Sequence, residues 1–174
     1  MKTTQIRIRN NCKIKNATKT SSNGIDFKSQ LEKTIYNCLL ELGFSPEYEP
    51  ETYTLIEGFN PITPFYDKET DKQKEKRLKE GIDLTPSKLL IRRSSRIIGI
   101  RYTPDIRFYY KGIQIFIEVK GKENDVFYIK KKLFIKYLDN LYETKRIKSM
   151  YFEVYSKKQL LQAIDIIKQN NESK

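Results

Sequence analysis

The sequence contains no histidine and no tryptophan, and Cys12 and Cys38 are its only cysteines. The lack of histidine excludes Ser-His-Asp and Cys-His triads, histidine-based nuclease motifs and histidine-ligated zinc. Two cysteines cannot build a disulfide framework or a four-cysteine zinc site. Any chemistry of this chain must therefore use carboxylates, lysine, tyrosine or a hard metal ion.

Acidic residues are also few compared with basic ones. The 174 residues include 34 Lys and Arg against 22 Asp and Glu, which gives a formal net charge of +12. This charge favours a polyanionic partner, either nucleic acid or an anionic membrane surface. No apolar run approaches the roughly 20 residues that span a bilayer, and no apolar segment typical of a signal peptide follows the first residues. We therefore expect a cytoplasmic protein with no membrane partner.

The positive charge is unevenly distributed along the chain. Residues 1–24 hold six basic residues and no acidic one, and we predict a flexible basic arm there, the alternative being a solvated tail without a role. We interpret residues 25–174 as a single domain, since this length suits one domain. Within it, residues 66–83 hold six bases and six acids, and residues 88–101 hold five bases and no acid. We predict a charged insertion at about 60–96.

Hydrophobic spacing predicts a mixed α/β fold. Apolar residues recur with helical period from near Asp26, with Asp26 or Ser29 as the cap, to a stop at Gly43. Helical spacing returns over 127–141 and 160–167. Residues 106–110 and 113–120 alternate as the two strands of a hairpin, and residues 150–155 resemble a further strand. This order predicts a central sheet flanked by helices.

The predicted hairpin brings two carboxylates together. With Lys111-Gly112 as a two-residue turn, Tyr110 pairs with Ile113, and the same register sets Asp105 directly opposite Glu118. Opposed side chains have Cβ atoms about 4.5–5.5 Å apart, so two like charges there repel unless a cation lies between them. Oxygen ligands of this kind suit Mg²⁺. Lys120 points to the same face, where it would serve an attacking water. The alternative is a surface salt bridge on a solvated sheet face.

These residues resemble the signature of the PD-(D/E)XK nuclease superfamily. The signature is formed here by Pro104-Asp105, twelve further residues and Glu118-Val119-Lys120. The likeness covers roughly residues 24–138 and includes the stretches GIDFKSQLE at 24–32, LGFSPEYEP at 42–50, YTPD at 102–105 and IEVKG at 117–121. These stretches look like a phage-type branch of the superfamily, which includes the junction-resolving endonuclease I of phages. The transposase subunit that cuts transposon ends has a similar plan. The stretch 58–100 is longer than such a family member needs.

The resemblance implies a restriction-endonuclease-like core and a metal-dependent active site. Asp105 and Glu118 would be metal ligands, the Val119 carbonyl would add a third, and Lys120 would serve the nucleophilic water. Glu32 matches an additional acid of the family, which makes it a further catalytic and metal-binding candidate. It also lies at the edge of the apolar face of its own helix. The alternative is that Glu32 pairs with Lys28 or Lys33 on a solvated helix.

The sequence therefore predicts a Mg²⁺-dependent endodeoxyribonuclease, with Mn²⁺ as a substitute. By resemblance it is a recombination or branched-DNA nuclease, forms a homodimer and, if phage-encoded, acts in the host cytoplasm. The alternatives are a non-catalytic DNA-binding protein with the same fold, a sequence-specific restriction-type endonuclease, and a basic protein of membrane surfaces. We predict phosphate contacts from basic residues along the chain: Arg7, Arg9, Arg92, Arg93, Arg96, Lys130, Lys131, Lys132 and Lys136.

Overall fold

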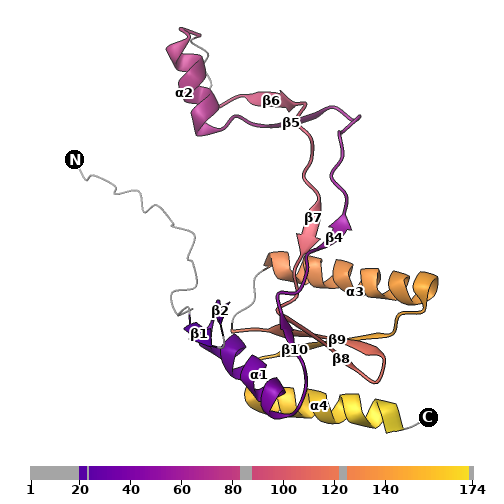
Figure 1. Cartoon of the computed structure of the whole chain (residues 1–174). Coiled ribbons are helices and arrows are strands. Elements are labelled where there is room, and N and C mark those ends of the chain that lie inside the picture. Colours follow the sequence, from indigo (N-terminus) through magenta and orange to yellow (C-terminus); the bar gives the residue numbers. More distant parts are fainter. Residues whose placement is uncertain (1–19, 23, 83–87, 122–124, 173–174) are drawn as a thin grey trace. The chain divides into compact units, whose positions relative to one another are not determined.

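The computed structural model describes residues 20–22, 24–82, 88–121 and 125–172 (Figure 1). Almost all of the predicted basic arm, including Arg7 and Arg9, lies outside these residues. The chain divides into two compact units, one formed by Met1–Tyr53 with Tyr102–Lys174 and the other by Thr54–Arg101. The predicted insertion at 60–96 falls inside the second unit.

The first unit is built on a four-stranded mixed sheet. Its strands are β3 (Glu47–Tyr48), β8 (Ile106–Tyr110), β9 (Ile113–Val119) and β10 (Ser149–Val154), in the order β10-β9-β8-β3. Strand β9 is antiparallel to β8 and parallel to β10, and β3 is antiparallel to β8. The predicted α/β class with a central mixed sheet is confirmed.

The β8–β9 hairpin has the predicted register. Ile106 pairs with Ile117, and Tyr110 pairs with Ile113. Lys111 and Gly112 both have positive φ, at 46° and 78°, as a type I′ turn requires. The twist of this turn matches that of the two strands, so the turn and the apolar alternation select the same pairing.

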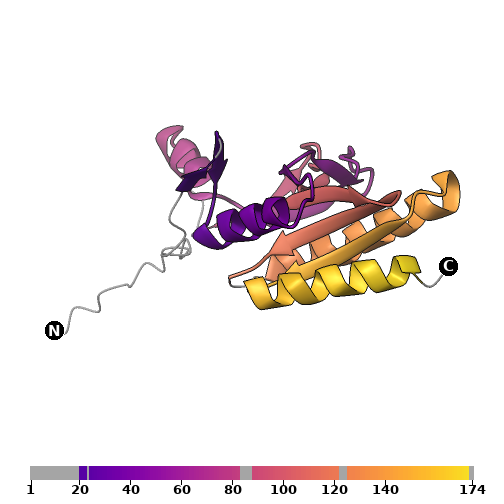
Figure 2. The same ribbon diagram turned by 60° about the horizontal axis from the view of Figure 1, so that its bottom comes forward.

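Helices cover both faces of this sheet. Helices α1 (Gln30–Glu41) and α4 (Lys157–Glu172) lie on one side, and α3 (Asp125–Lys145) lies on the other (Figures 1 and 2). The α1/α4 side holds the main hydrophobic core, which is formed by fully buried residues of both helices and of β8 and β9: Ile35, Leu39, Ile106, Phe108, Ile115, Ile117, Leu160 and Ile167.

The opposite face holds an aromatic cluster under α3. Phe134 of α3 is fully buried, and its ring centroid lies 5.1 Å from that of Phe116 on β9 and 4.6 Å from that of Tyr102. This is also the face on which Glu118 projects, since Glu118 and Phe116 are two residues apart on one strand. The alternative of a solvated sheet face is therefore wrong: α3 covers it, and Glu118 is only 3% exposed.

The first helix begins later than predicted. Strand β2 (Ile25–Phe27) pairs with β1 (Thr20–Ser22) where the periodicity predicted the first helical turn. Phe27 takes an extended conformation and packs between the rings of Tyr36 and Tyr48. Of the two candidate caps, Ser29 is the one used: its hydroxyl accepts the Glu32 N–H. The helix ends before Gly43, whose φ of 81° suits the predicted stop.

The second unit consists of two short ribbons and a helix. Strand β4 (Tyr53–Ile56) pairs with β7 (Ile100–Tyr102), and β5 (Phe65–Lys68) pairs with β6 (Leu90–Arg93). Between the ribbons, Gly58 and Gly99 allow a close backbone approach, since a Cβ on Gly99 would clash with the Ile56 carbonyl oxygen.

A buried ion pair links helix α2 (Asp71–Lys79) to Glu69, the residue that follows β5. The Arg77 guanidinium donates to both carboxylate oxygens of Glu69, over 2.9 and 3.1 Å. Both side chains are buried, and a bidentate pair of this kind combines two charge-assisted hydrogen bonds. The described part of the charged insertion thus contains a helix, and the hydrogen bonds from Arg77 lower the pKa of Glu69.

Candidate functional site

Asp105 is held at the entrance to β8 by the neighbouring strand. Its Oδ2 accepts the Val119 N–H over 2.7 Å, and its own carbonyl oxygen accepts the Glu49 N–H over 2.8 Å. Pro104, which has no N–H to donate, precedes it and is buried. The bond to Val119 places the Asp105 carboxylate beside the end of β9 that carries Glu118.

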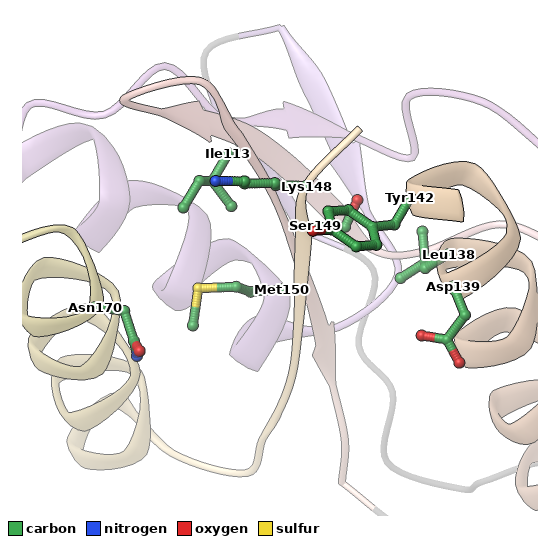
Figure 3. Close-up of a pocket in the computed structure, with 8 residues that line it drawn as sticks. All are labelled: Ile113, Leu138, Asp139, Tyr142, Lys148, Ser149, Met150 and Asn170. Atoms are coloured by element: carbon green, nitrogen blue, oxygen red, sulfur yellow. The ribbon is translucent and has the colours of Figure 1, made fainter. Parts of the chain in front are cut away.

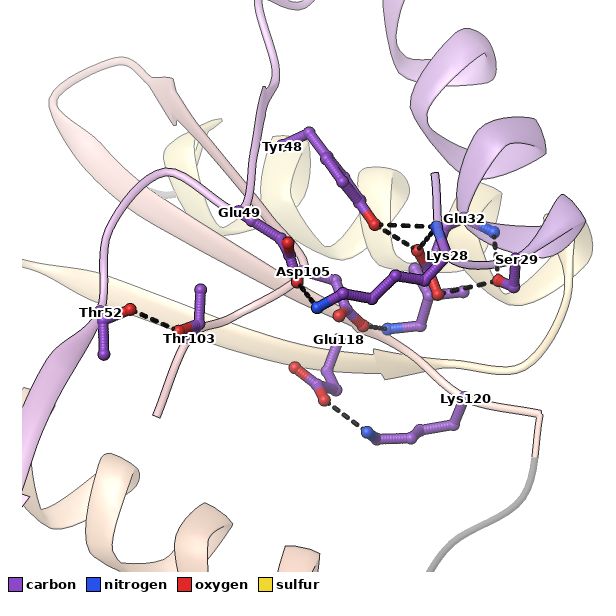
Figure 4. A network of polar contacts seen from close by, with 11 residues as sticks. Lys28, Ser29, Glu32, Tyr48, Glu49, Thr52, Thr103, Asp105, Glu118 and Lys120 are labelled. Carbon is purple, nitrogen blue, oxygen red and sulfur yellow. Dashed lines mark hydrogen bonds and ion pairs between the residues drawn. The ribbon is translucent and has the colours of Figure 1, made fainter. Parts of the chain in front are cut away.

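Glu118 receives a donor on each carboxylate oxygen. The Tyr102 hydroxyl donates to Oε2, and the Lys120 ammonium lies 2.5 Å from Oε1 (Figure 4). The Lys120 Nζ also lies 3.8 Å from the centroid of the Phe127 ring, a distance at which a cation interacts with an aromatic face. Lys120 is therefore held between the sheet and the first turn of α3.

The electrostatics of the pair are unfavourable without a cation. Burial and, next, the negative charge of Glu118 raise the pKa of Asp105 to about 8, and the charge of Glu32 raises it further. The Val119 N–H and Lys120 act in the opposite direction but do not offset these effects. A divalent cation between the carboxylates would remove the repulsion.

Glu32 lies near this pair but is already used by its own helix. Its Oε1 accepts the Ser29 hydroxyl over 2.9 Å, and its Oε2 accepts the Lys28 N–H over 3.1 Å and the Tyr48 hydroxyl over 2.6 Å. The ammonium groups of Lys28 and Lys33, which the alternative paired with Glu32, contact other residues. Lys28 pairs with Glu49, and Lys33 donates to Thr20 and Ser21. Glu32 thus acts as part of a helix cap, and its catalytic role stays a prediction.

The oxygen donors of the site fit Mg²⁺. Among the described residues, no three acidic or cysteine side chains group as a complete metal cage. Mg²⁺ does not require one, because it is commonly held by one or two carboxylates together with water and phosphate oxygens. Asp105 and Glu118 supply the two carboxylates. The Val119 amide is committed to Asp105, and its carbonyl as a third ligand stays a prediction.

Two tyrosines behind Glu118 were not predicted as site residues. The Tyr102 hydroxyl contacts Glu118 and lies 3.2 Å from the Tyr151 hydroxyl. Burial and the charge of Glu118 raise the pKa of Tyr102 well above its usual range, which keeps its hydroxyl a donor. Its place in the stretch YTPD gives no sign of either contact, because Glu118 is 16 residues away in sequence and Tyr151 is 49.

Those predicted DNA-binding residues that the structure describes belong to α3 and to the second unit. On α3, Lys132 and Lys136 are exposed and Lys130 is half-buried, whereas Lys131 pairs with Glu153 over 2.8 Å. The arginines belong to the second unit, where Arg92 is exposed and Arg93 pairs with Asp67 over 3.4 Å. These contacts stay predictions.

A pocket of about 470 Å³ lies away from the carboxylates, at the other end of β9 (Figure 3). Ile113, the first residue of β9, lines it together with Met150 and Tyr142, and Asp139 is its one carboxylate. Without a second carboxylate it does not resemble the site at Asp105 and Glu118.

No helix among the described residues is long and apolar enough to span a membrane. No protein-family model matches the sequence, and comparisons with curated proteins and with solved structures gave no significant match.

We expect Tyr102→Phe to destabilise the protein through the loss of one hydroxyl. The Glu118 oxygen is buried and would lose its donor, and hydrogen bonds to charged groups contribute about 1.5–3 kcal/mol. Urea unfolding should show this decrease in the free energy of unfolding. Tyr142→Phe, on an exposed part of α3, is the matched control and should unfold like the wild type. Equal stability of the two variants would contradict the Tyr102–Glu118 bond.

Proposed function

We propose that this chain is a Mg²⁺-dependent endodeoxyribonuclease that hydrolyses phosphodiester bonds, with Mn²⁺ as a substitute. The observation that supports this most strongly is the arrangement of the half-buried Asp105 carboxylate and the buried Glu118 carboxylate at one end of a hairpin, with Lys120 beside Glu118. The mixed sheet flanked by helices is consistent with a restriction-endonuclease-like core. Following the resemblance, the substrate is branched or recombining DNA and the enzyme is a homodimer.

Each side chain has a distinct role in this proposal. Asp105 and Glu118 would hold Mg²⁺, which would neutralise charge on the phosphodiester and make water a better nucleophile. The Val119 N–H keeps the Asp105 carboxylate in place. Lys120, held near Glu118 and Phe127, orients the attacking water and offsets the negative charge that grows on the phosphate in the transition state.

The cost of the carboxylate pair supports a catalytic role. An acid whose pKa is raised by desolvation and, next, by a neighbouring negative charge, as that of Asp105 is, destabilises the fold at neutral pH. A purely structural position would be served better by a neutral side chain. The rival is a non-catalytic DNA-binding protein, which is favoured by one observation: Lys120 already neutralises Glu118 without a metal.

A cleavage panel tests the proposal. Linear duplex, single strand, flap and four-way junction are incubated with Mg²⁺ or Mn²⁺ and the wild type, Lys120→Ala or Lys158→Ala. Lys158 is exposed at the start of α4 and serves as the control. We expect metal-dependent cutting by the wild type and the control, and a rate lower by about 10²–10⁴-fold for Lys120→Ala. Preference for the junction or the flap would identify a branched-DNA nuclease.

Thermal unfolding distinguishes the proposed nuclease from a non-catalytic DNA-binding protein. Mg²⁺ should raise the melting temperature of the wild type, and Glu118→Ala should abolish that gain. DNA binding without cutting on any substrate, together with no stabilisation by Mg²⁺, would show a non-catalytic DNA-binding protein.

A further inference from the structure

The β5–β6 ribbon of the second unit has two faces of different character. Tyr66 pairs with Arg92, and Lys68 pairs with Leu90. Directly paired residues of antiparallel strands share a face, so these four side chains lie together, and all four are exposed. The other face carries Phe65, Asp67, Ile91 and Arg93, and three of these are half-buried.

The charged side chains of the two faces differ in whether they form ion pairs with described residues. On the half-buried face Arg93 forms an ion pair with Asp67 over 3.4 Å, and nearby Lys88 pairs with Asp71 over 2.6 Å. On the exposed face, Arg92 and Lys68 make no ion pair with any described residue. Two cations without an ion pair among the described residues thus lie beside Tyr66 and Leu90, which are 56% and 75% exposed. We call this set, Tyr66, Lys68, Leu90 and Arg92, the ribbon face.

This combination fits duplex DNA better than it fits a protein surface. The major groove of B-form DNA admits a two-stranded β-ribbon, and its edges carry phosphates that attract unpaired cations. A guanidinium matches the O6 and N7 acceptors of guanine with two parallel bonds, whereas an ammonium acts as a point charge on a phosphate. An apolar side chain contacts the methyl group of thymine.

We propose that the ribbon face enters the major groove of duplex DNA, where Arg92 contacts base edges and Lys68 contacts a phosphate. The proposal rests on the proposed function for its choice of DNA as the partner. It adds a base-contacting element, and of the neighbours Arg92 and Arg93 it gives that role to Arg92, since Arg93 lies on the opposite face of the ribbon.

Binding is measured by fluorescence anisotropy with the full chain in EDTA, so that no cutting occurs. Arg92→Gln and Lys68→Gln are compared with Lys72→Gln, an equal loss of charge on the exposed side of α2 in the same unit. We expect about tenfold weaker binding of duplex DNA for Arg92→Gln, with loss of any preference among duplex sequences. Lys68→Gln should weaken all sequences equally and lower the salt dependence, and Lys72→Gln should bind as the wild type does.

An RNA duplex of the same sequence distinguishes groove contacts from plain charge. Its major groove is too deep and narrow for side chains to read, so Arg92→Gln should have little effect on RNA binding. Methylation of guanine N7, in the major groove, should reduce wild-type binding to DNA and not that of Arg92→Gln.

Several results would overturn the ribbon proposal. One is unchanged DNA binding by Arg92→Gln, and another is an equal loss of its binding to DNA, RNA and anionic vesicles. A third is a Tyr66→Ala variant in which only the oligomeric state changes, which would assign the ribbon face to a second copy of the chain. The cleavage panel is read separately. If the wild type cuts DNA and Arg92→Gln binds DNA as well as the wild type does, only the ribbon proposal is wrong. If Arg92→Gln loses DNA binding but the wild type cuts no substrate, only the proposed nuclease activity is wrong.

Discussion

Asp105→Asn should abolish metal-dependent cleavage and, at the same time, stabilise the metal-free protein. Asparagine keeps an oxygen that accepts the Val119 N–H, but it removes the charge that Glu118 and Glu32 repel. Loss of a charged ligand should lower the cleavage rate on the order of a thousandfold. The gain in melting temperature should appear in EDTA, and Mg²⁺ should no longer raise it further.

The stabilisation should depend on pH in a defined direction. The pKa of Asp105 is about 8 in the folded protein, well above the value of about 3.9 expected in the unfolded chain. The folded state therefore binds this proton more tightly. The stabilisation of the folded state by this bound proton is complete below about pH 4 and is lost as the pH rises through about 8. The difference in melting temperature between Asp105→Asn and the wild type should grow from about pH 5 to about pH 8.

Asp165→Asn is the control for this experiment. Asp165 is exposed on α4 and forms no ion pair within 4.0 Å with a described residue, so its variant should follow the wild type at every pH. An Asp105→Asn protein that is less stable than the wild type across the pH range would contradict the repulsion between the carboxylates. Retained cleavage would remove Asp105 from the proposed metal site.

Phe134→Ala should produce the largest loss of stability. Phe134 is fully buried at the centre of the aromatic cluster. Its ring contacts Tyr102 and Tyr151, the two tyrosines behind Glu118. It also contacts the rings of Tyr53, Phe116 and Tyr137. Truncation of a buried phenylalanine costs about 3–5 kcal/mol, because a cavity remains where the ring was. Urea unfolding followed by circular dichroism measures this decrease.

Two further variants make the result specific. Phe134→Leu keeps most of the apolar volume and should lose much less stability. Ile135→Ala, at the next and exposed position of α3, should unfold almost as the wild type does. If Phe134→Ala and Ile135→Ala were equally stable, α3 would not pack on the sheet through the aromatic cluster.

The pairing in the hairpin could be predicted because its determinants are local. A two-residue turn with Gly112 and a strict alternation of apolar side chains leave one register, and that register sets Asp105 beside Glu118. The start of α1 could not be predicted as well. The helical period continues through Phe27, but this side chain is more favourably buried between Tyr36 and Tyr48 in an extended segment.

The α/β class, the hairpin and the placement of two carboxylates near Lys120 thus follow from turn chemistry and periodicity, which act over a few residues. The groups that support the site depend on how distant segments pack. Tyr102 reaches Glu118 across 16 residues, and Tyr48 reaches Glu32 across another 16. Such contacts depend on where α1 and α3 pack against the sheet, and packing brings together side chains whose separation in sequence carries no local signal.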